Sequence, residues 1–364
     1  MPYKNNIYDL SLKDLTELFN TWGELDYRVD QTWKGLYQQL WSAPEEFSTL
    51  PKGIRMKLSE NYAEPTNQAD TKPFFTYLNS IKTQKSADGE TIKTLFALKD
   101  GMQVEAVLMR YNNRRTLCIS TQAGCAMGCV FCATGQMGFS RQLTSGEIVE
   151  QVIYYARQLA LDHEQVTNIV VMGMGEPFHN YDATLSAIER LNNPRGFNLG
   201  ARRFTISTVG LVPGIRRFTQ EHSQINLAIS LHAADDALRS QLLPINRKYQ
   251  LEQLFSACQE YIQVTHRRLS FEWALIQGVN DTPEQAHLLV QRLKPLRIAG
   301  SNLCHVNIIP LNPTQKYTGK ASTHHSAIAF QEILEHSGIP CTIRLRRGIE
   351  IQAGCGQLAG NKTP

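Results

Sequence analysis

Three cysteines stand close together in the segment GCAMGCVFCATG, at Cys125, Cys129 and Cys132. Thiolates in this C-x3-C-x2-C pattern can bind three iron atoms of a cubane [4Fe–4S] cluster from one short loop. The fourth iron then has no protein ligand, so it is open to a small molecule that offers an amine and a carboxylate. The glycines and alanines around the cysteines allow the loop to wrap closely. The three cysteines are therefore predicted to ligate a cluster with one open position.

A structural zinc site is the main alternative for the same cysteines. Structural zinc takes four ligands, usually supplied as two separated pairs. The sequence has no second C-x2-C or H-x3-H pair to complete such a site. The spacing therefore favours the iron–sulfur cluster.

The elements that must position this loop follow a repeating order from Thr116 onward. Six strand-like runs alternate with helix-like stretches, and Thr144-x-x-Glu147 is a capping box that begins the first of these helices. The expected strands are 116–120, 168–174, 203–208, 226–231, 269–276 and 305–311, and the expected helices are 146–161, 182–191, 251–263 and 283–296. Such alternation predicts a parallel sheet with helical crossovers. Six units are too few to close an eight-stranded barrel, so the predicted class is α/β, with a partial (β/α)6 barrel.

The remaining chain divides around this barrel. Residues 1–75 have apolar residues at helical spacing and predict a small helical accessory domain. Residues 76–110 predict a short β-rich connecting segment, in which FFTYL (74–78), KTLFAL and VEAVLM are the β-prone runs of this region. The barrel is expected over 111–345. Residues 346–364 form a glycine-rich tail that carries Cys355.

Composition limits the functional classes. The 364 residues are 42% hydrophobic and 19% charged, which excludes wholesale disorder, and the net charge of +4 alone does not indicate nucleic acid. Five arginine pairs, however, fit contacts to RNA phosphates: 114–115, 202–203, 216–217, 267–268 and 346–347. No apolar run approaches the length of a membrane span, and the N-terminus lacks the apolar core of a signal peptide. We therefore expect a cytoplasmic protein with no membrane association, whose eight cysteines are reduced.

The cysteine pattern, together with Gly175-Glu176-Pro177 after the next strand, resembles the radical S-adenosylmethionine (SAM) superfamily. Within it the chain resembles the RlmN/Cfr family of RNA adenine methyltransferases over essentially its whole length. The matching stretches are RRTLCISTQAGCAMGCVFCATG, VVMGMGEPFHN, FTISTVGLVPGI, NLAISLHAADDALRSQLLPIN, IIPLNP and GCGQLAG. The resemblance departs from the family at Ile349 and Gly354, and the extra glycine predicts a looser loop around Cys355.

The resemblance implies a role for each matched residue. Gly175, Glu176, Ser207, Ser230, Leu231, His232 and Asn312 would contact SAM. Cys355 would be the cysteine that becomes S-methylated. Cys118 would be its resolving partner through a transient disulfide bond, and Glu105 would accept the proton from the base. Cys118 could instead be a buried strand residue, and Glu105 an outward-facing one. Cys258, Cys304 and Cys341 match no functional motif and are expected in the core.

The chemistry implied by the resemblance is methylation of adenosine, at C2 in preference to C8, in large-subunit ribosomal RNA and also in transfer RNA. Adenine C2 is electron-poor, so a carbon radical can add where ordinary methyl displacement is disfavoured. The resemblance further implies a [4Fe–4S] cluster, SAM, an electron donor such as flavodoxin or ferredoxin, and a monomeric enzyme. Two alternatives stay open: another radical SAM enzyme, such as a methylthiotransferase or a glycyl-radical activase, and a non-enzymatic, metal-stabilised RNA-binding protein.

Overall fold

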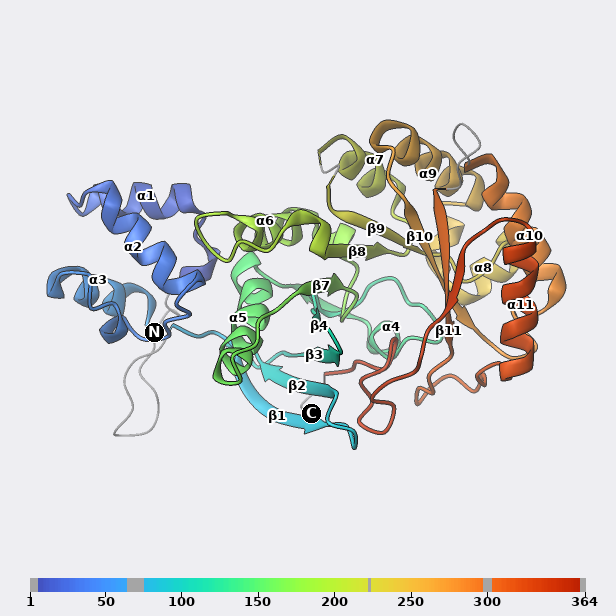
Figure 1. Cartoon of the computed structure of the whole chain (residues 1–364), viewed down its shortest axis with the longest axis horizontal. Helices are drawn as coiled ribbons and strands as arrows, with labels where there is room; N and C mark the ends of the chain where they lie inside the picture. The colour runs from blue at the N-terminus through green and yellow to red at the C-terminus, as the bar shows by residue number, and fades with distance from the viewer. Residues whose placement is uncertain (1–5, 64–74, 222–223, 297–302, 361–364) are drawn as a thin grey trace.

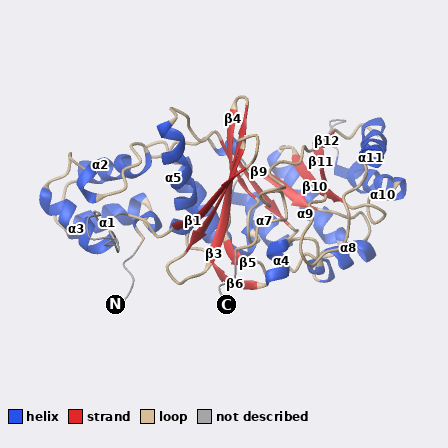
Figure 2. Ribbon diagram, turned by 90° about the horizontal axis from the view of Figure 1, so that it is seen from below, coloured by secondary structure: helices blue, strands red, loops and turns tan. Residues whose placement is uncertain are grey.

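The computed structural model describes residues 6–63, 75–221, 224–296 and 303–360. One ten-stranded sheet organises the molecule, with the order β1-β2-β3-β4-β7-β8-β9-β10-β11-β12 (Figures 1 and 2). Neighbouring strands from β4 to β12 are parallel, whereas β1, β2, β3 and β4 pair antiparallel. The parallel strands are β4 (Arg114–Cys118), β7 (Asn168–Val171), β8 (Phe204–Thr208), β9 (Asn226–Ser230), β10 (Leu269–Leu275), β11 (Cys304–Pro310) and β12 (Cys341–Ile343).

Helices follow the strands in turn, as expected for β/α units. They are α4 (Ala133–Met137), α5 (Ser145–Leu161), α6 (Tyr181–Asn192), α7 (Val212–Glu221), α8 (Asp236–Leu242), α9 (Leu251–Thr265), α10 (Pro283–Leu293) and α11 (His324–His336). The expected capping box begins α5: the Thr144 hydroxyl accepts from the Glu147 N–H, and the Glu147 carboxylate accepts from the Thr144 N–H. The inner face of α5 carries Ile148, Val149 and Val152, whose side chains are completely buried.

The prediction of a partial (β/α)6 barrel is confirmed, and the sheet is open between β1 and β12. Several details differ. The short strand β12 and helices α4, α7, α8 and α11 were not predicted. The segment FFTYL is not a strand in its described part, since β1 (Asn79–Lys85) begins after it; Phe74 lies outside the described residues. The connecting strands β2 (Thr91–Ala97) and β3 (Gln103–Tyr111) continue the barrel sheet, because β3 pairs with β4. A small separate sheet contains β5 (Gln122–Gly124) and β6 (Phe139–Gln142).

The N-terminal region is helical, as predicted, and contains α1 (Leu12–Thr21), α2 (Asp26–Tyr37) and α3 (Lys52–Tyr62). It lies at one end of the molecule beside α5 and α6 (Figure 1). The Asp9 carboxylate accepts from the Gly146 N–H at the start of α5, and Arg190 on α6 donates to the Leu10 carbonyl. Arg157 on α5 also donates to the Tyr8 hydroxyl. Polar contacts therefore fix this region on the barrel's helical layer.

The C-terminal tail crosses the open side of the sheet. After β12 it passes the β3–β4 hairpin, where Arg347 donates to the Arg110 carbonyl, and then follows β2, where Lys93 donates to the Gln352 carbonyl. Its last described part reaches β3, where the Ala359 N–H donates to the Glu105 carboxylate. The tail thus joins the two edges of the open sheet and brings residues 352–359 across its interior. None of the described helices is long and apolar enough to cross a membrane.

Candidate active site at the carboxyl ends of the strands

The cysteine loop lies between β5 and α4. The Cys125 N–H donates to the Gly138 carbonyl (2.9 Å), and Cys132 is the N-terminal cap residue of α4. A Cβ on Gly135 would lie 2.9 Å from backbone atoms of Cys129, so the loop closes over a position that only glycine fits. Burial raises the pKa of the Cys125 thiol to about 12 and that of Cys129 well above its usual value, and the neighbouring thiolates raise both further. The thiols therefore need a cation before they can be thiolates together.

This arrangement fits a cluster better than a single ion. Among the described residues, no three Cys, His, Asp or Glu side chains converge as they would around one metal ion. A cubane cluster does not need its ligands to converge on one point, because each thiolate binds a different iron atom of the cluster. Cys125 and Cys132 both lie near enough to Cys129 to raise its pKa, and the Phe131 side chain packs with the small apolar cluster at the loop. The cysteines thus suit a cluster with three protein ligands.

Gly175 and Glu176 form the turn after β7. Gly175 has a φ of 103°, and a Cβ there would lie 2.6 Å from the Gln122 side chain, so this turn requires glycine. The Glu176 carboxylate is buried and accepts from the N–H groups of Phe178 (3.1 Å) and Val209 (2.8 Å). Burial raises its pKa to about 7, against the hydrogen bonds that lower it. The ionised form of such a buried carboxylate would be stabilised by a cationic partner, such as the ammonium group of an amino acid.

The other predicted SAM contacts also lie at the carboxyl ends of the strands. The hydroxyls of Ser207 on β8 and Ser230 on β9 are 3.1 Å apart. His232 follows β9 with a φ of 60°, and its Nδ1 accepts from the Ala274 N–H. Burial and the nearby Arg239 lower the pKa of His232 to about 3, so it is neutral. Leu231 differs: its side chain is fully buried, and its backbone N–H and carbonyl bond to Glu272 and Arg239.

Cys355 is held between the cysteine loop and the end of β11. Its carbonyl accepts from Asn312 Nδ2 (3.1 Å), and the next carbonyl, of Gly356, accepts from the Ala133 N–H (2.7 Å) beside Cys132. The thiol is solvent-accessible although protein surrounds it. That partial desolvation raises its pKa, Glu272 raises it further, and Arg344 opposes both. A Cβ on Gly354 would lie 2.6 Å from Asn312 Nδ2, so the glycine makes room for this contact.

Glu105 on β3 and Cys118 on β4 face the tail from the side opposite the cysteine loop and β11. Cys118 is paired with Val107 on β3, which is paired with Lys93 on β2, so all three side chains share one face of the sheet. Lys93 forms a buried ion pair of 2.8 Å with Glu105. Burial raises the pKa of Glu105, and Lys93 opposes this. Burial also raises the pKa of the Cys118 thiol, with a further contribution from the Cys355 thiolate, which indicates that the two thiols are near each other.

Two site residues were missed by the sequence analysis. Lys93 ties Glu105 to the tail, since it pairs with the carboxylate and also donates to the Gln352 carbonyl. Glu272, in the middle of β10, is buried, is aligned with Ser230 on β9, and accepts from Asn307 Nδ2 (2.8 Å). For Glu272 the signal was a charged residue between apolar neighbours in a strand-like run, since strands of a parallel sheet are buried on both faces. Lys93 stands at the start of the run KTLFAL and gave no such signal.

The predicted disulfide bond is wrong for this structure, because all eight cysteines are free thiols. Cys258, Cys304 and Cys341 are buried, as expected for core residues. Several of the paired arginines have partners within the protein. Arg115, Arg216 and Arg217 form ion pairs with protein carboxylates. The pairs 114–115, 202–203 and 267–268 stand at or before the amino ends of β4, β8 and β10, away from the edge that carries the site.

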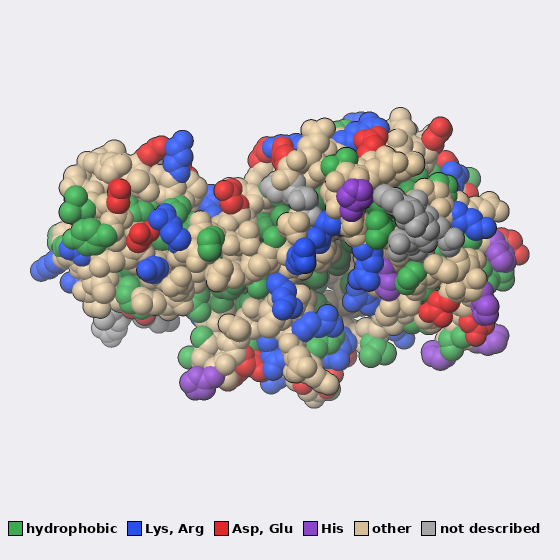
Figure 3. Space-filling model, turned by 45° about the horizontal axis from the view of Figure 1, so that its top comes forward, with side chains coloured by type: hydrophobic (Ala, Val, Ile, Leu, Met, Phe, Trp, Pro, Cys, Tyr) green, Lys and Arg blue, Asp and Glu red, His purple; other side chains and the backbone are tan. Residues whose placement is uncertain are grey.

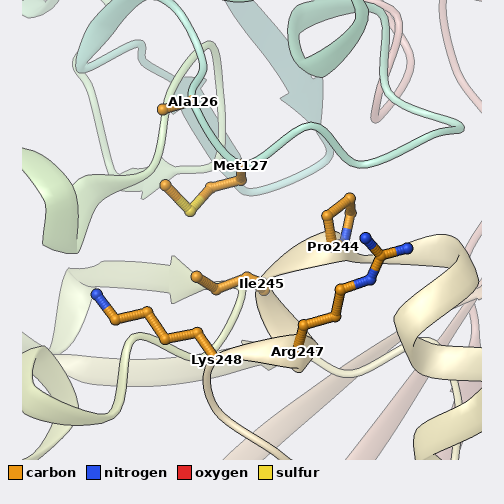
Figure 4. Close-up of a pocket in the computed structure, with 6 residues that line it drawn as sticks. All are labelled: Ala126, Met127, Pro244, Ile245, Arg247 and Lys248. Carbon is orange, nitrogen blue, oxygen red and sulfur yellow. The ribbon is translucent and has the colours of Figure 1, made fainter.

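A hollow of about 540 Å³ lies against the outer side of the cysteine loop. Its lining residues are Ala126, Met127, Pro244, Ile245, Arg247 and Lys248 (Figure 4). Met127 comes from the loop, and Ile245, Arg247 and Lys248 lie across from it. Arg247 and Lys248 are exposed, and neither forms an ion pair with another described residue. This groove is therefore a basic surface next to two of the three predicted iron ligands.

Comparisons with known proteins agree with this geometry. Residues 119–290 match the model of the radical SAM superfamily, and residues 5–63 match that of the ribosomal RNA large subunit methyltransferase N-terminal domain. The chain is 49% identical over 359 residues to the probable dual-specificity RNA methyltransferase RlmN of Chloroflexus aurantiacus, covering 97% of this chain and 92% of that protein. It is 47% identical to dual-specificity RNA methyltransferase RlmN 1 of Myxococcus xanthus, covering 97% and 94%. A crystal structure of a radical SAM methyltransferase from Sphaerobacter thermophilus superimposes with a TM-score of 0.90 and 44% identity, over 98% of this chain and 99% of that one.

The buried ion pair predicts the behaviour of a Lys93 variant. Lys93→Met leaves the Glu105 carboxylate buried without its cation, so we expect the free energy of unfolding at pH 8 to fall by about 3–5 kcal/mol. The double variant Lys93→Met/Glu105→Gln has no unpaired charge and should lose less than the single variant. Urea unfolding followed by circular dichroism measures both differences.

Lys82→Met is the matched control, because Lys82 is exposed on β1 and forms no ion pair with a described residue. This variant should change the unfolding free energy by no more than about 0.5 kcal/mol. Equal losses in the Lys82 and Lys93 variants would contradict the assignment of a buried ion pair.

Proposed function

The chain belongs to the RlmN family of radical SAM RNA methyltransferases, and from this we propose that it methylates C2 of an adenosine through Cys355. It uses SAM and a [4Fe–4S] cluster, as radical SAM proteins do. We propose large-subunit ribosomal RNA as the main substrate and transfer RNA as a second one. The words "dual-specificity RNA methyltransferase" in the names of its relatives support two RNA substrates.

The position of Cys355 is the observation that carries the proposal. A methyl carrier must reach the cofactor that supplies the methyl group and then the base. Asn312 and the backbone of Ala133 hold the carbonyls of Cys355 and of the following Gly356, next to the predicted iron ligand Cys132. Its thiol is also accessible, whereas Cys258, Cys304 and Cys341 are buried. Among the cysteines outside the predicted cluster, Cys355 therefore best combines access with proximity to the cysteine loop.

Other residues take roles that suit their surroundings. The bound cofactors supply the methyl group and the carbon radical that an electron-poor ring carbon requires. We propose that Glu176 holds the amino group of SAM, with Ser207, Ser230, Asn312 and His232 around it. Glu105 would accept the proton from C2, because its burial keeps the carboxylate more basic than usual while Lys93 keeps it ionised. Cys118, on the same face of the sheet, would take part in product release.

RNA must present an unstacked base to this site. On the face drawn in Figure 3, Lys and Arg side chains gather beside a hollow near the middle of the molecule, which would favour an RNA backbone. We propose that the helical region over 1–75 is a separate RNA-contacting domain. The segment 76–110 connects it to the barrel, which extends over 111–345 before the carrier tail at 346–364. We further propose that the enzyme acts as a monomer in the cytoplasm.

A one-electron donor, such as flavodoxin or ferredoxin, must reach the cluster from outside. The basic groove of Figure 4 suits such acidic proteins, because Met127 belongs to the loop between two iron ligands and Arg247 and Lys248 have no ion pair of their own. The tail occupies a different side of the loop, near α4. Donor and base would therefore approach the cluster from different directions.

The role of Cys355 is tested with Cys355→Ala, which should lose RNA methylation down to the background of the assay. The variant should still bind the cluster, shown by its visible absorbance after anaerobic reconstitution, because Cys355 is not one of its ligands. Cys341→Ala removes a core cysteine and should retain methylation. Methylation by Cys355→Ala at the wild-type rate would contradict a carrier role and would favour a different radical SAM reaction.

The position of the methyl group is tested by digesting the methylated RNA to nucleosides. We expect 2-methyladenosine when the product is compared with authentic 2- and 8-methyladenosine by chromatography and mass spectrometry. RNA from cells that lack the protein should lose this nucleoside. Detection of 8-methyladenosine alone would contradict the C2 assignment.

The donor groove is tested with the charge-reversal variant Arg247→Glu/Lys248→Glu. With flavodoxin as the reductant, the variant should methylate RNA about tenfold more slowly, because charge complementarity with the donor is lost. The rate with dithionite, which needs no docking surface, should stay within about twofold of wild type. The control variant Arg202→Glu/Arg203→Glu reverses two exposed charges at the amino edge of the sheet and should behave as wild type with both reductants. An equal loss with both reductants would indicate an RNA contact at the groove instead.

A further inference from the structure

Arg239 on α8 is a completely buried arginine, with 0% of its surface exposed. Its Nε donates to the Leu231 carbonyl (3.1 Å), Nη1 to Asn246 Oδ1 (2.8 Å), and Nη2 to the Val209 carbonyl (2.6 Å). All of these acceptors are neutral. Within the described residues, the guanidinium makes no ion pair with a carboxylate. The side chain therefore holds a positive charge inside the protein with hydrogen bonds but no adjacent counter-ion.

Such a charge is costly to bury unless an opposite charge lies nearby. Burial lowers the pKa of Arg239 to about 10, which leaves it protonated at neutral pH. The Cys129 thiolate is the largest influence in the opposite direction, followed by Asp236 and Cys258. Asp236 is already engaged, because its Oδ1 accepts from Asn246 Nδ2 and the Leu251 N–H. The thiolate of Cys129 in the cysteine loop is thus the main negative charge that acts on Arg239, with Asp236 and Cys258 contributing less.

The structure connects Arg239 to that loop directly. Leu242, on the same helix, accepts through its carbonyl from the Val130 N–H (3.1 Å), next to Cys129. Val209, whose carbonyl accepts from Arg239, packs in the small apolar cluster that also contacts Cys129 and Cys132. The Val209 N–H donates in turn to Glu176. The guanidinium thus lies behind the cysteine loop and binds the same residue, Val209, as the carboxylate proposed to bind SAM.

We propose that Arg239 is the buried counter-charge of the iron–sulfur cluster and makes the cluster easier to reduce. The inference rests on the proposed function, because it takes Cys125, Cys129 and Cys132 as the iron ligands. Reduction moves one electron from the donor protein to the cluster, so the donor is oxidised and the cluster gains one negative charge. A fixed positive charge in a poorly solvated region stabilises that product more than the oxidised cluster. Arg239 is a positioning and tuning residue, since it touches neither SAM nor RNA in this arrangement.

The reduction potential of the bound cluster tests the proposal. Arg239→Gln removes the charge and should shift the midpoint potential to a more negative value. Arg239→Lys keeps the charge and should leave the potential close to wild type, although it cannot make all of the hydrogen bonds. The potential is measured on the reconstituted full-length protein by anaerobic redox titration, following the electron paramagnetic resonance signal of the reduced cluster.

A surface arginine is the matched control. Arg216→Gln makes the same change in net charge on α7, where Arg216 is partly exposed and paired with Glu260, and it should not shift the potential. A purely structural role for Arg239 predicts that the Lys and Gln variants differ from wild type in stability, with equal potentials. Equal potentials in wild type, Arg239→Lys and Arg239→Gln would therefore overturn the proposal.

A second pair of variants keeps the test decisive if Arg239→Gln does not fold. Cys258 on α9 is buried and near enough to Arg239 for each to shift the pKa of the other. Cys258→Asp should bring a carboxylate beside the guanidinium and make the potential more negative, whereas Cys258→Asn should not. An unchanged reduction potential in Cys258→Asp, with the cluster bound, would overturn this inference but leave the proposed function standing. Absence of any cluster in the wild-type protein would overturn both.

Discussion

The crossing of the tail over the open sheet is the constraint on which the proposed site depends. A partial barrel leaves its interior open between β1 and β12, and residues 346–360 run across that gap. Contacts at both ends are needed, because a tail fixed only at β12 would have many conformations and a large entropy to lose at each catalytic cycle. Lys93 and Glu105 supply the far attachment, while Asn312 and Ala133 supply the near one. Cys355 is itself a point of the near attachment, and the far contacts at Gln352 and Ala359 lie before and after it in the chain.

Charges buried beneath the tail follow from the same architecture. The interior beneath the tail is shielded from water, so a charged or polar residue buried there must find a partner in the protein. Lys93 and Glu105 pair with each other, and Glu272 accepts from Asn307. Arg239 and Glu176 are joined through Val209, whose carbonyl accepts from Arg239 and whose N–H donates to Glu176. Burial raises the pKa of Glu176 in the protein alone, and a cationic cofactor group would lower it again.

The sequence predicted the parts of the site that are local and missed those that arise from packing. Cys125, Cys129 and Cys132 share one loop, and strand–helix alternation places Glu176, Ser207 and Asn312 at one edge of the sheet. Lys93 could not be assigned, because its partner is 12 residues away on another strand and its role depends on the path of the tail. Arg239 resembled any surface arginine of a short helix. Gly354 was expected to loosen the carrier loop, whereas the structure shows that it allows the close approach of Asn312.

The state of Glu105 connects this architecture to the proposed chemistry. One oxygen pairs with Lys93 and the other accepts from the Ala359 N–H, so both oxygens are engaged while the tail is in place. The oxygen bonded to Ala359 is the one that would take the proton, because a small movement of the tail can break that bond and expose it. Proton transfer would then neutralise the carboxylate and weaken its attraction to Lys93, which also holds Gln352. The same ion pair that fixes the tail before reaction would in this way loosen it afterwards, when the methylated RNA has to leave.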